Sequence, residues 1–299
     1  MAFERHFADI KLLSAEPLFR DCLLPDIAAG VVFPAIRKDR IDFYYSGGKL
    51  FSYTARSGFT THHKYASVVR HDAKDQYVKA DALEAIRNFV EGYARIKENC
   101  AVYAKGSEAF NVSQLYGKFS CAKRGQVSSV VVLDIEVSLR RDGKEADVEP
   151  GASPQSGSDR MDLLLLDTKR SLLRFFEAKL FGNKEIRAKS DRRPAIVGQM
   201  ARYQAQLANT EVTAQMLAGY EAHVKVLNEL LGLQPPLPKP LTLELVPHLL
   251  VVGFDAEQER KLEREVKTLR DYGLSVHHVG GVRSTTAEKL FSGGRQRWL

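Results

Sequence analysis

Two adjacent apolar runs separated by a short polar segment are the feature of this sequence that most restricts its fold. The runs cover residues 162–167 and 172–181, and residues 168–171 lie between them. Apolar runs of this length on either side of a polar segment predict a β-hairpin. Both runs are apolar at most positions rather than at alternate ones, which is typical of strands buried on both faces of a sheet. We therefore expect this hairpin at the centre of a sheet that is covered on both sides.

The turn also determines which residues of the two strands lie opposite each other. Paired positions in an antiparallel hairpin have a constant sum, so a pair between Asp167 and Leu172 places Asp162 opposite Glu177. Directly opposed side chains point to the same face, with their Cβ atoms roughly 5 Å apart. Lys179 is two positions beyond Glu177 and therefore lies on that face as well. The register predicts two carboxylates and one ammonium group side by side in an otherwise apolar sheet.

Neighbouring carboxylates repel each other, so their proximity needs a physical reason. A divalent cation removes the repulsion, and Mg²⁺ commonly uses one or two protein carboxylates while it keeps water ligands for a phosphate substrate. Such an ion polarises a phosphodiester and lowers the pKa of a bound water, and an adjacent lysine orients that water or stabilises developing negative charge. The pattern favours metal-assisted phosphodiester hydrolysis over the alternative of a solvated strand face with a surface ion pair.

A helix expected over residues 194–207 adds two polar residues to this pattern. Gln199 and Tyr203 stand four positions apart and so share one helix face. Together with Asp162 and the tripeptide Glu177-Ala178-Lys179, they make the chain resemble the PD-(D/E)XK nuclease superfamily, in particular its RecB-like branch. That family has an Asp on one strand, Glu-x-Lys on the next strand and Gln-x-x-x-Tyr on the helix that follows.

The resemblance implies a role for each of these residues. Asp162, Glu177 and the main-chain carbonyl of Ala178 would hold Mg²⁺, for which Mn²⁺ can substitute. Lys179 would position the attacking water or stabilise developing charge. The Gln-x-x-x-Tyr residues of the helix would support the site or contact the nucleic-acid backbone.

The family often has a further acidic residue upstream of the Asp. Glu136, on a strand expected over residues 129–139, is our choice for this role. Glu84 and Glu91, on a helix expected over residues 80–97, are alternatives that the spacing does not decide.

The order of the expected elements predicts an α/β fold. After the helix at 80–97 come a strand at 129–139, the hairpin, helices at 194–207 and 211–231, a strand region at 241–253, a helix that Asp255 and Gln258 cap, and a strand at 275–280. This order is similar to the restriction-endonuclease-like core of the family, which has a helix, a three-strand antiparallel meander, a helix and a strand. We expect residues 79–299 to form the nuclease-like domain and residues 1–78 to form an N-terminal appended region.

The N-terminal region is expected to begin with short helices and turns over residues 1–36. Strands at 41–45 and 50–53 on either side of a Gly-containing turn predict a β-hairpin there. Aromatic residues alternate with lysines and arginines in this region, and such a mixture can stack bases and bind phosphates. We favour the simpler interpretation of a small sheet with one packed face and one solvated face.

A basic loop follows the second strand of the hairpin. Its positive residues are Lys184, Arg187, Lys189, Arg192 and Arg193, and their position would suit contacts with phosphates. The chain of 299 residues carries a net charge of +7, which is compatible with a polyanionic partner. We therefore expect nucleic acid as the partner, DNA rather than RNA. A homo-oligomer, or a helicase or defence protein as a partner, is also compatible with the family.

The cysteines bear on the cellular location. Cys22, Cys100 and Cys121 are widely spaced and odd in number, which gives neither a disulfide framework nor zinc-ligand spacing and favours a reducing, cytoplasmic setting. The apolar runs are too short to cross a membrane, and residues 1–10 lack the pattern of a signal peptide. We expect no membrane partner.

Two other functions remain compatible with these patterns. A catalytically inactive nuclease-fold protein would keep the strands, the helix and the basic charge, and it would bind nucleic acid without cleaving it. A protein-interaction module would use the basic loop to dock an acidic protein. Stabilisation by Mg²⁺ or Mn²⁺ separates the nuclease from the inactive fold, and competition by nucleic acid separates both from the interaction module.

Overall fold

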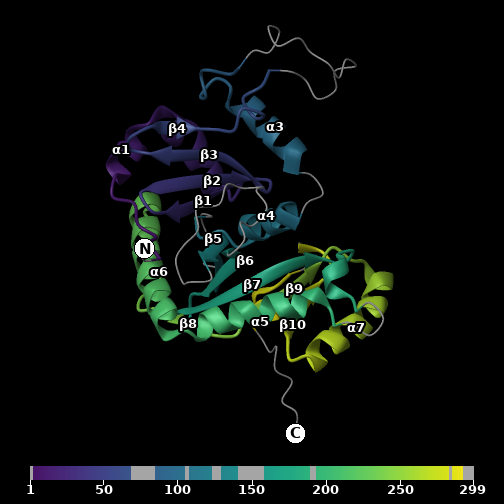
Figure 1. Cartoon of the computed structure of the whole chain (residues 1–299). Coiled ribbons are helices and arrows are strands. Elements are labelled where there is room, and N and C mark those ends of the chain that lie inside the picture. The colour runs from purple at the N-terminus through teal and green to yellow at the C-terminus, as the bar shows by residue number, and fades with distance from the viewer. Residues whose placement is uncertain are drawn as a thin grey trace, which may run out of the picture.

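The computed structural model describes residues 3–68, 85–104, 108–122, 129–140, 158–188, 193–282 and 285–291. Within these residues the chain forms two β-sheets with helices packed around them (Figure 1). The combination of helices with antiparallel and parallel strands confirms the expected α/β class.

The N-terminal residues form an antiparallel sheet that follows three short helical segments. These segments are α1 (Ile10–Ala15), η1 (Leu18–Leu23) and α2 (Leu24–Ala28), and the strands, in sheet order, are β1 (Val32–Arg37), β2 (Arg40–Tyr45), β3 (Gly48–Thr54) and β4 (Gly58–Thr60). The expected hairpin is present as β2 and β3. Its turn residues Ser46 and Gly47 both have positive φ, at 53° and 91°, as a tight two-residue hairpin turn requires.

Strand β1 corrects the sequence analysis, which expected only helices and turns before residue 36. Pro34 lies within the strand, opposite Phe43 of β2. Proline is disfavoured in strands because it lacks an N–H donor, but it is tolerated at a sheet edge. Strand β1 is the edge strand of its sheet, which explains both its composition and why the pattern did not reveal it.

Three of the aromatic residues that could have stacked bases lie in the core of the N-terminal sheet. Phe43 and Phe51 are fully buried, Tyr53 is almost so, and Phe43 packs against Phe19 of η1 with ring centroids 6.1 Å apart. Stacking of bases on these three rings is therefore excluded. The favoured interpretation of one packed face agrees with this arrangement.

The larger sheet has the strand order β10-β9-β7-β6-β5. Its strands are β5 (Val130–Arg140), β6 (Ser158–Asp167), β7 (Leu172–Leu180), β8 (Thr242–Leu243), which pairs with the start of β7, β9 (His248–Val252) and β10 (Ser275–Val279). Strands β5, β6 and β7 form an antiparallel meander, whereas β9 and β10 run parallel to β7. The remaining helices are α3 (Tyr93–Ala104), α4 (Glu108–Lys118), η3 (Lys184–Ile186), α5 (Ala195–Ala208), α6 (Thr210–Leu231), α7 (Ala256–Asp271) and α8 (Ala287–Phe291).

The central hairpin has the predicted register and is buried on both faces. Asp167 lies opposite Leu172, and the pairing continues to Leu163 opposite Phe176, one position short of the predicted pair between Asp162 and Glu177. Leu164 packs in a core with α5 and α6 on one face, and Leu163 packs in a second core with α4 and α8 on the other. Figure 1 shows α5 running across the front of this sheet.

The helix expected over residues 80–97 is confirmed only over residues 93–97 and is wrong over residues 85–92. Helix α3 begins only at Tyr93, and residues 80–84 lie outside the described residues. The side chain of Asn88 accepts hydrogen bonds from the backbone N–H groups of Val90 and Glu91. Such a local side-chain bond stabilises a turn in competition with a helix.

The N-terminal cap of α7 is as predicted, because the side chains of Asp255 and Gln258 each accept a hydrogen bond from the other residue's backbone N–H.

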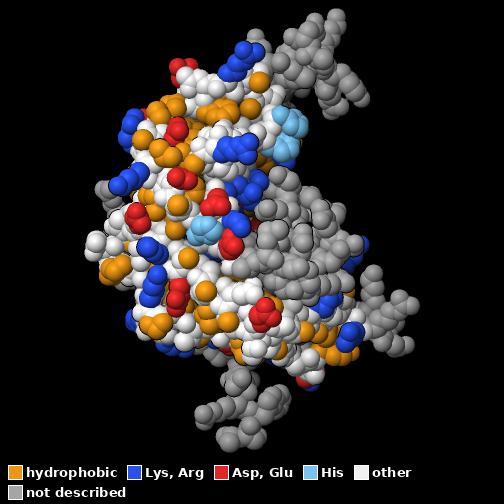
Figure 2. Space-filling view, turned by 60° about the vertical axis from the view of Figure 1, so that its left-hand side comes forward, with side chains coloured by type: hydrophobic (Ala, Val, Ile, Leu, Met, Phe, Trp, Pro, Cys, Tyr) orange, Lys and Arg blue, Asp and Glu red, His pale blue; other side chains and the backbone are white. Residues whose placement is uncertain are grey.

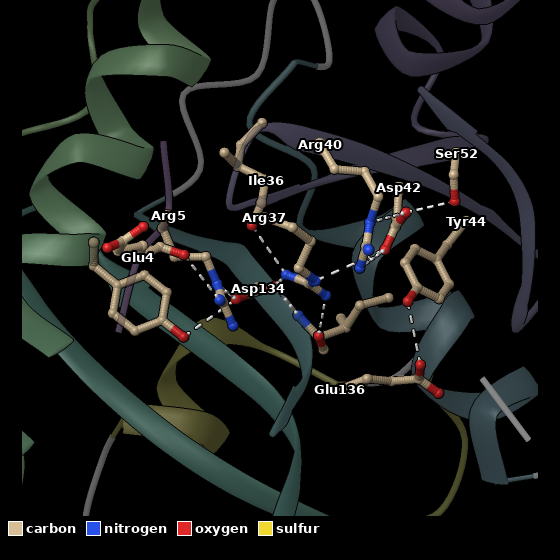
Figure 3. Close-up of polar contacts among 12 residues, drawn as sticks. Glu4, Arg5, Ile36, Arg37, Arg40, Asp42, Tyr44, Ser52, Asp134 and Glu136 are labelled. Atoms are coloured by element: carbon tan, nitrogen blue, oxygen red, sulfur yellow. Dashed lines mark hydrogen bonds and ion pairs between the residues drawn. The ribbon is translucent and has the colours of Figure 1, made fainter. Parts of the chain in front are cut away.

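A buried carboxylate joins the two sheets (Figure 3). Asp134 of β5 is 0% exposed. It accepts hydrogen bonds from Nε of Arg5 at 2.9 Å, from Nη1 of Arg37 at 2.6 Å and from the hydroxyl of Tyr220 at 3.2 Å. Burial raises the pKa of Asp134, but the two guanidinium groups outweigh this effect and hold its pKa well below the usual range. The N-terminal segment, β1, β5 and α6 therefore meet at one ion cluster.

The hydrophobic core is shared between the two sheets. A single core cluster contains Phe3, Phe43, Leu164 and Tyr220, which come from the N-terminal segment, both sheets and α6. The expected boundary between residues 78 and 79 lies outside the described residues, so the division into two domains stays a prediction.

Within the described ranges, we find no helix with the length and apolarity that a membrane crossing needs.

The Asp134 cluster predicts a large effect on stability. Asp134→Asn is expected to lower the free energy of unfolding by about 3–5 kcal/mol, because it removes the buried carboxylate with which the Arg5 and Arg37 guanidinium groups pair. Since the folded-state pKa of Asp134 is lowered, its contribution is present above the unfolded pKa of about 4 and is lost as the pH falls further. Urea unfolding at neutral and acid pH measures both effects.

The matched control is Asp39→Asn. The Asp39 side chain is 64% exposed and pairs with His6 at 3.0 Å, so its replacement is expected to change stability by less than about 1 kcal/mol. Equal stability of the two variants at neutral pH would contradict the role of Asp134.

Candidate active site

The two central strands bring Asp162, Glu177 and Lys179 together. The backbone N–H of Ala178 donates to Oδ2 of Asp162 at 2.9 Å, which fixes that carboxylate across the strand pair. The ammonium group of Lys179 lies 2.9 Å from Oε1 of Glu177. Glu177 is 2% exposed and Lys179 7% exposed, whereas Asp162 is half-buried. The three side chains therefore lie together within the sheet.

Helix α5 holds the Glu177 carboxylate from the side. Nε2 of Gln199 donates to Oε1 of Glu177 at 2.8 Å and also lies 2.6 Å from the Tyr203 hydroxyl. The same hydroxyl is 3.1 Å from Oε2 of Glu177 and bonds to the main-chain carbonyl of Arg160. Met200 lies on the same helix face and is buried against the sheet. The four-residue spacing thus places both polar side chains on one carboxylate.

The site holds more negative than positive charge in a desolvated setting. Removal from water and the charge of Glu177 raise the pKa of Asp162 well above its usual range. Burial also raises the pKa of Glu177, although Lys179, Tyr203 and Gln199 favour its ionised form. Burial lowers the pKa of Lys179, but Glu177 and other nearby carboxylates outweigh this and raise it. An additional cation would offset the cost of ionising both acids.

A carboxylate that the sequence analysis missed also reaches this cluster. Oε2 of Glu108, in the first turn of α4, lies 3.9 Å from Nζ of Lys179. Asn183 holds the other oxygen of Glu108 with a hydrogen bond of 2.6 Å. Glu185 of η3 pairs with Lys179 at 3.0 Å. The apolar spacing of Val112, Leu115 and Tyr116, which are buried in α4, was the signal that could have located this helix.

Glu136 lies on β5, next to the strand β6 that carries Asp162, but its side chain is directed toward the N-terminal sheet. Its neighbours Ile135 and Val137 pair with the residues on either side of Asp162. Its backbone has a positive φ of 51°, and its carboxylate accepts a hydrogen bond of 3.2 Å from the Tyr44 hydroxyl of the N-terminal sheet (Figure 3). Of the two alternatives, Glu91 lies in the turn before α3, and Glu84 lies outside the described residues.

The basic loop is only partly available for phosphate contacts. Lys184 and Arg193 are exposed. Arg187 instead donates to the main-chain carbonyls of Phe181 at 2.7 Å and Asn183 at 3.4 Å, so it holds the loop together. Lys189 and Arg192 lie outside the described residues.

The expected metal ligands are few, and they suit a hard cation. Among the described residues, no group of three or more His, Cys, Asp or Glu side chains is arranged to hold a metal ion. The expected set is instead the carboxylates of Asp162 and Glu177 with the main-chain carbonyl of Ala178. Such an all-oxygen set with two carboxylates fits Mg²⁺, which keeps several of its water ligands. The excess negative charge of the cluster favours a cation here.

Comparison of the chain with protein-family models, with curated proteins and with solved structures gives no match in any of the three. Function is therefore inferred from the site itself.

The charge excess predicts that one substitution in the site stabilises the protein. Asp162→Asn is expected to raise the free energy of unfolding in EDTA by about 1 kcal/mol, because it removes a like-charge pair. The amide oxygen can still accept the hydrogen bond from Ala178. Denaturant unfolding measures the change.

Asp159→Asn, on the same strand, is the matched control. Asp159 is 7% exposed and accepts hydrogen bonds from Arg202 at 3.2 Å and Gln206 at 2.9 Å, so its replacement is expected to cost about 1 kcal/mol. If Asp162→Asn instead destabilises the protein as Asp159→Asn does, the carboxylates of Asp162 and Glu177 do not repel each other in the folded protein.

Proposed function

We propose that this protein is a metal-dependent nuclease that hydrolyses phosphodiester bonds of nucleic acid, DNA rather than RNA. The observation that carries the proposal is the buried cluster of Asp162, Glu177 and Lys179. In this cluster two acids that are removed from water lie beside one positively charged side chain, that of the lysine. Clusters of this kind with strongly perturbed pKa values are typical of functional sites, because they are costly to maintain for structure alone. Gln199 and Tyr203 add a preorganised support on the Glu177 carboxylate.

The order of elements supports the same proposal. Helix α4, the β5–β6–β7 meander, helix α5 and strand β9 follow each other as in the restriction-endonuclease-like core. The site residues lie on the second and third strands of the meander and on the helix behind them, where the family resemblance expects them. We therefore assign the chain a restriction-endonuclease-like fold as part of the proposal, and we retain a cytoplasmic location with it.

The residues of the site would divide the chemistry among them. Asp162, Glu177 and the Ala178 carbonyl would hold Mg²⁺ or Mn²⁺, which when bound polarises the phosphodiester and lowers the pKa of a water. Lys179, held beside Glu177, would orient the attacking water or stabilise charge on the phosphate. Gln199 and Tyr203 would fix the orientation of Glu177. We assign the upstream acidic position to Glu108 rather than Glu136, because Glu108 approaches Lys179.

Cleavage assays on single- and double-stranded DNA and RNA test the proposal. We expect cleavage with Mg²⁺ or Mn²⁺, none with EDTA, and a loss of at least about 100-fold in rate for Lys179→Ala, since it removes the group that orients water or stabilises charge. Asp162→Asn should be equally inactive although it is more stable than the wild type, which separates loss of function from loss of fold.

Lys169→Ala is the control, because Lys169 is exposed in the turn of the same hairpin and should leave the rate unchanged. Metal-dependent cleavage by Lys179→Ala at the wild-type rate would overturn its role. Absence of cleavage on all four substrates would leave the inactive nuclease fold as the better description.

Metal binding is expected to stabilise the folded protein. A metal concentration of about 100 times the Kd should add about 2.7 kcal/mol to the free energy of unfolding, and Asp162→Asn should remove most of this gain. Thermal unfolding with Mg²⁺, Mn²⁺ or EDTA measures it. An identical melting temperature in all three conditions would count against both the metal site and the nuclease.

A further inference from the structure

A basic pocket lies on the N-terminal sheet, apart from the residues of the candidate active site. It has a volume of about 290 Å³ and is lined by Arg40, Lys49 and Lys64 together with the hydroxyl groups of Ser52, Thr54 and Thr60. None of its described lining residues is an Asp or a Glu. A volume of roughly 300 Å³ is at the small end of ligand sites, so the pocket suits a group of nucleotide size with negative charge.

The strand pairing preorganises the floor of this pocket. Asp42 pairs with Ser52 and Tyr44 pairs with Lys49 across β2 and β3, so these side chains share one face. Asp42 is 2% exposed beneath the pocket. Its carboxylate accepts hydrogen bonds from Nη2 of Arg40 at 3.3 Å and from the Ser52 hydroxyl at 2.6 Å, which fixes both groups in place.

Asp42 is shared between Arg40 of the pocket lining and a second arginine outside it. Arg37 also approaches Asp42, at 3.9 Å, so this carboxylate is shared by two guanidinium groups (Figure 3). Lys49 and Lys64 add two further positive charges to the lining. Cations combined with Ser and Thr hydroxyls are the groups that usually contact nucleic-acid phosphates.

Tyrosine and histidine rings lie at the edge of the pocket. The ammonium group of Lys64 is 5.0 Å from the ring centroids of both Tyr65 and Tyr103, and Tyr103 is 53% exposed. His62, which lines the pocket, and His63 are exposed, with ring centroids 4.3 Å apart. Figure 2 shows histidine side chains next to lysine and arginine side chains at the height of the N-terminal sheet. An exposed ring beside a phosphate-binding cation is the arrangement on which single-stranded bases stack.

We propose that this pocket binds a nucleotide unit of single-stranded nucleic acid. Arg40, Lys49 and Lys64 contact its phosphate, and Tyr103 offers a ring on which a neighbouring base stacks. The choice of nucleic acid as the ligand rests on the proposed nuclease function. The pocket itself rests on the charges and contacts of the N-terminal sheet.

A series of residues in contact with one another leads from the pocket to the candidate active site. Lys49 pairs with Tyr44, and the Tyr44 hydroxyl donates to Glu136. The residues next to Glu136 pair with those on either side of Asp162. A nucleic-acid strand bound in the pocket therefore lies on one particular face of the N-terminal sheet. This is the face that contacts β5, the β-strand next to Asp162. The pocket would hold substrate at a distance from the cleaved bond.

Fluorescence anisotropy with a short labelled single-stranded DNA tests the proposal, in EDTA so that no cleavage occurs. The double variant Lys49→Ala/Lys64→Ala is expected to bind roughly tenfold more weakly, because two charge-assisted contacts are lost. The slope of log Kd against log salt concentration should fall by about 1.4, which is about 0.7 for each phosphate contact. Lys49→Arg/Lys64→Arg should restore both values, because arginine also binds phosphate.

The matched control is Lys261→Ala/Lys267→Ala. Both lysines are exposed on α7, which lies at the other end of the molecule from the N-terminal sheet (Figure 1), so the same charge is removed elsewhere. Equal affinity of the pocket variant and this control would overturn the proposal. Displacement of the labelled DNA by an equal concentration of thymidine monophosphate would also overturn it. In that case the pocket would bind a free nucleotide rather than a nucleic-acid strand.

The outcomes also separate this pocket from the proposed enzyme. If no substrate is cleaved but the pocket variant loses binding, the nuclease proposal fails and the pocket proposal stands. If cleavage depends on Asp162 and strand binding does not depend on Lys49 and Lys64, the pocket proposal alone fails.

Discussion

The ionised carboxylate of Asp134 is the interaction on which the arrangement of the two sheets depends. It lies at an irregularity of β5, where the register with β6 shifts between Val132 and Asp134, and it binds Arg5, Arg37 and Tyr220. These partners come from three parts of the chain that are far apart in sequence. Because a buried charge without its partner is strongly unfavourable, the N-terminal segment, β1 and α6 must pack around β5 together. This contact fixes the polar face of the N-terminal sheet beside the strand that neighbours Asp162.

Two of the buried ion clusters in the described part of the chain have opposite charge balance. At Asp134, two guanidinium groups surround one carboxylate, and its pKa is lowered. At the candidate active site, Asp162 and Glu177 share Lys179, and the pKa of both acids is raised. In the first cluster the carboxylate is paired with groups of the protein itself, and this pairing holds the fold together. The second leaves negative charge that a bound cation would offset, which is why we interpret it as functional. The described lining of the pocket at Lys49 contains cations and hydroxyl groups and no Asp or Glu, which suits a phosphate.

The sequence predicted elements whose signals are local, and it failed where the signal was weak or masked. The register of the central hairpin, the turn at Gly47 and the cap of α7 were all expected, since each follows from a few consecutive residues. Strand β1 was missed because Pro34 argues against a strand unless the strand lies at an edge. Helix α3 was placed too early because the side chain of Asn88 forms a turn in a stretch with helical spacing.

For the site, the sequence by itself determined which side chains share a face. The alternation of strands and the constant sum of a hairpin place Asp162, Glu177 and Lys179 together, and a spacing of four places Gln199 and Tyr203 together. Only the tertiary structure decided that Glu108 rather than Glu136 approaches Lys179. It alone also gathered Arg40, Lys49 and Lys64 around one pocket. The reason is physical: backbone periodicity relates residues within one element, whereas contacts between distant elements depend on how their surfaces pack and where buried charges find partners.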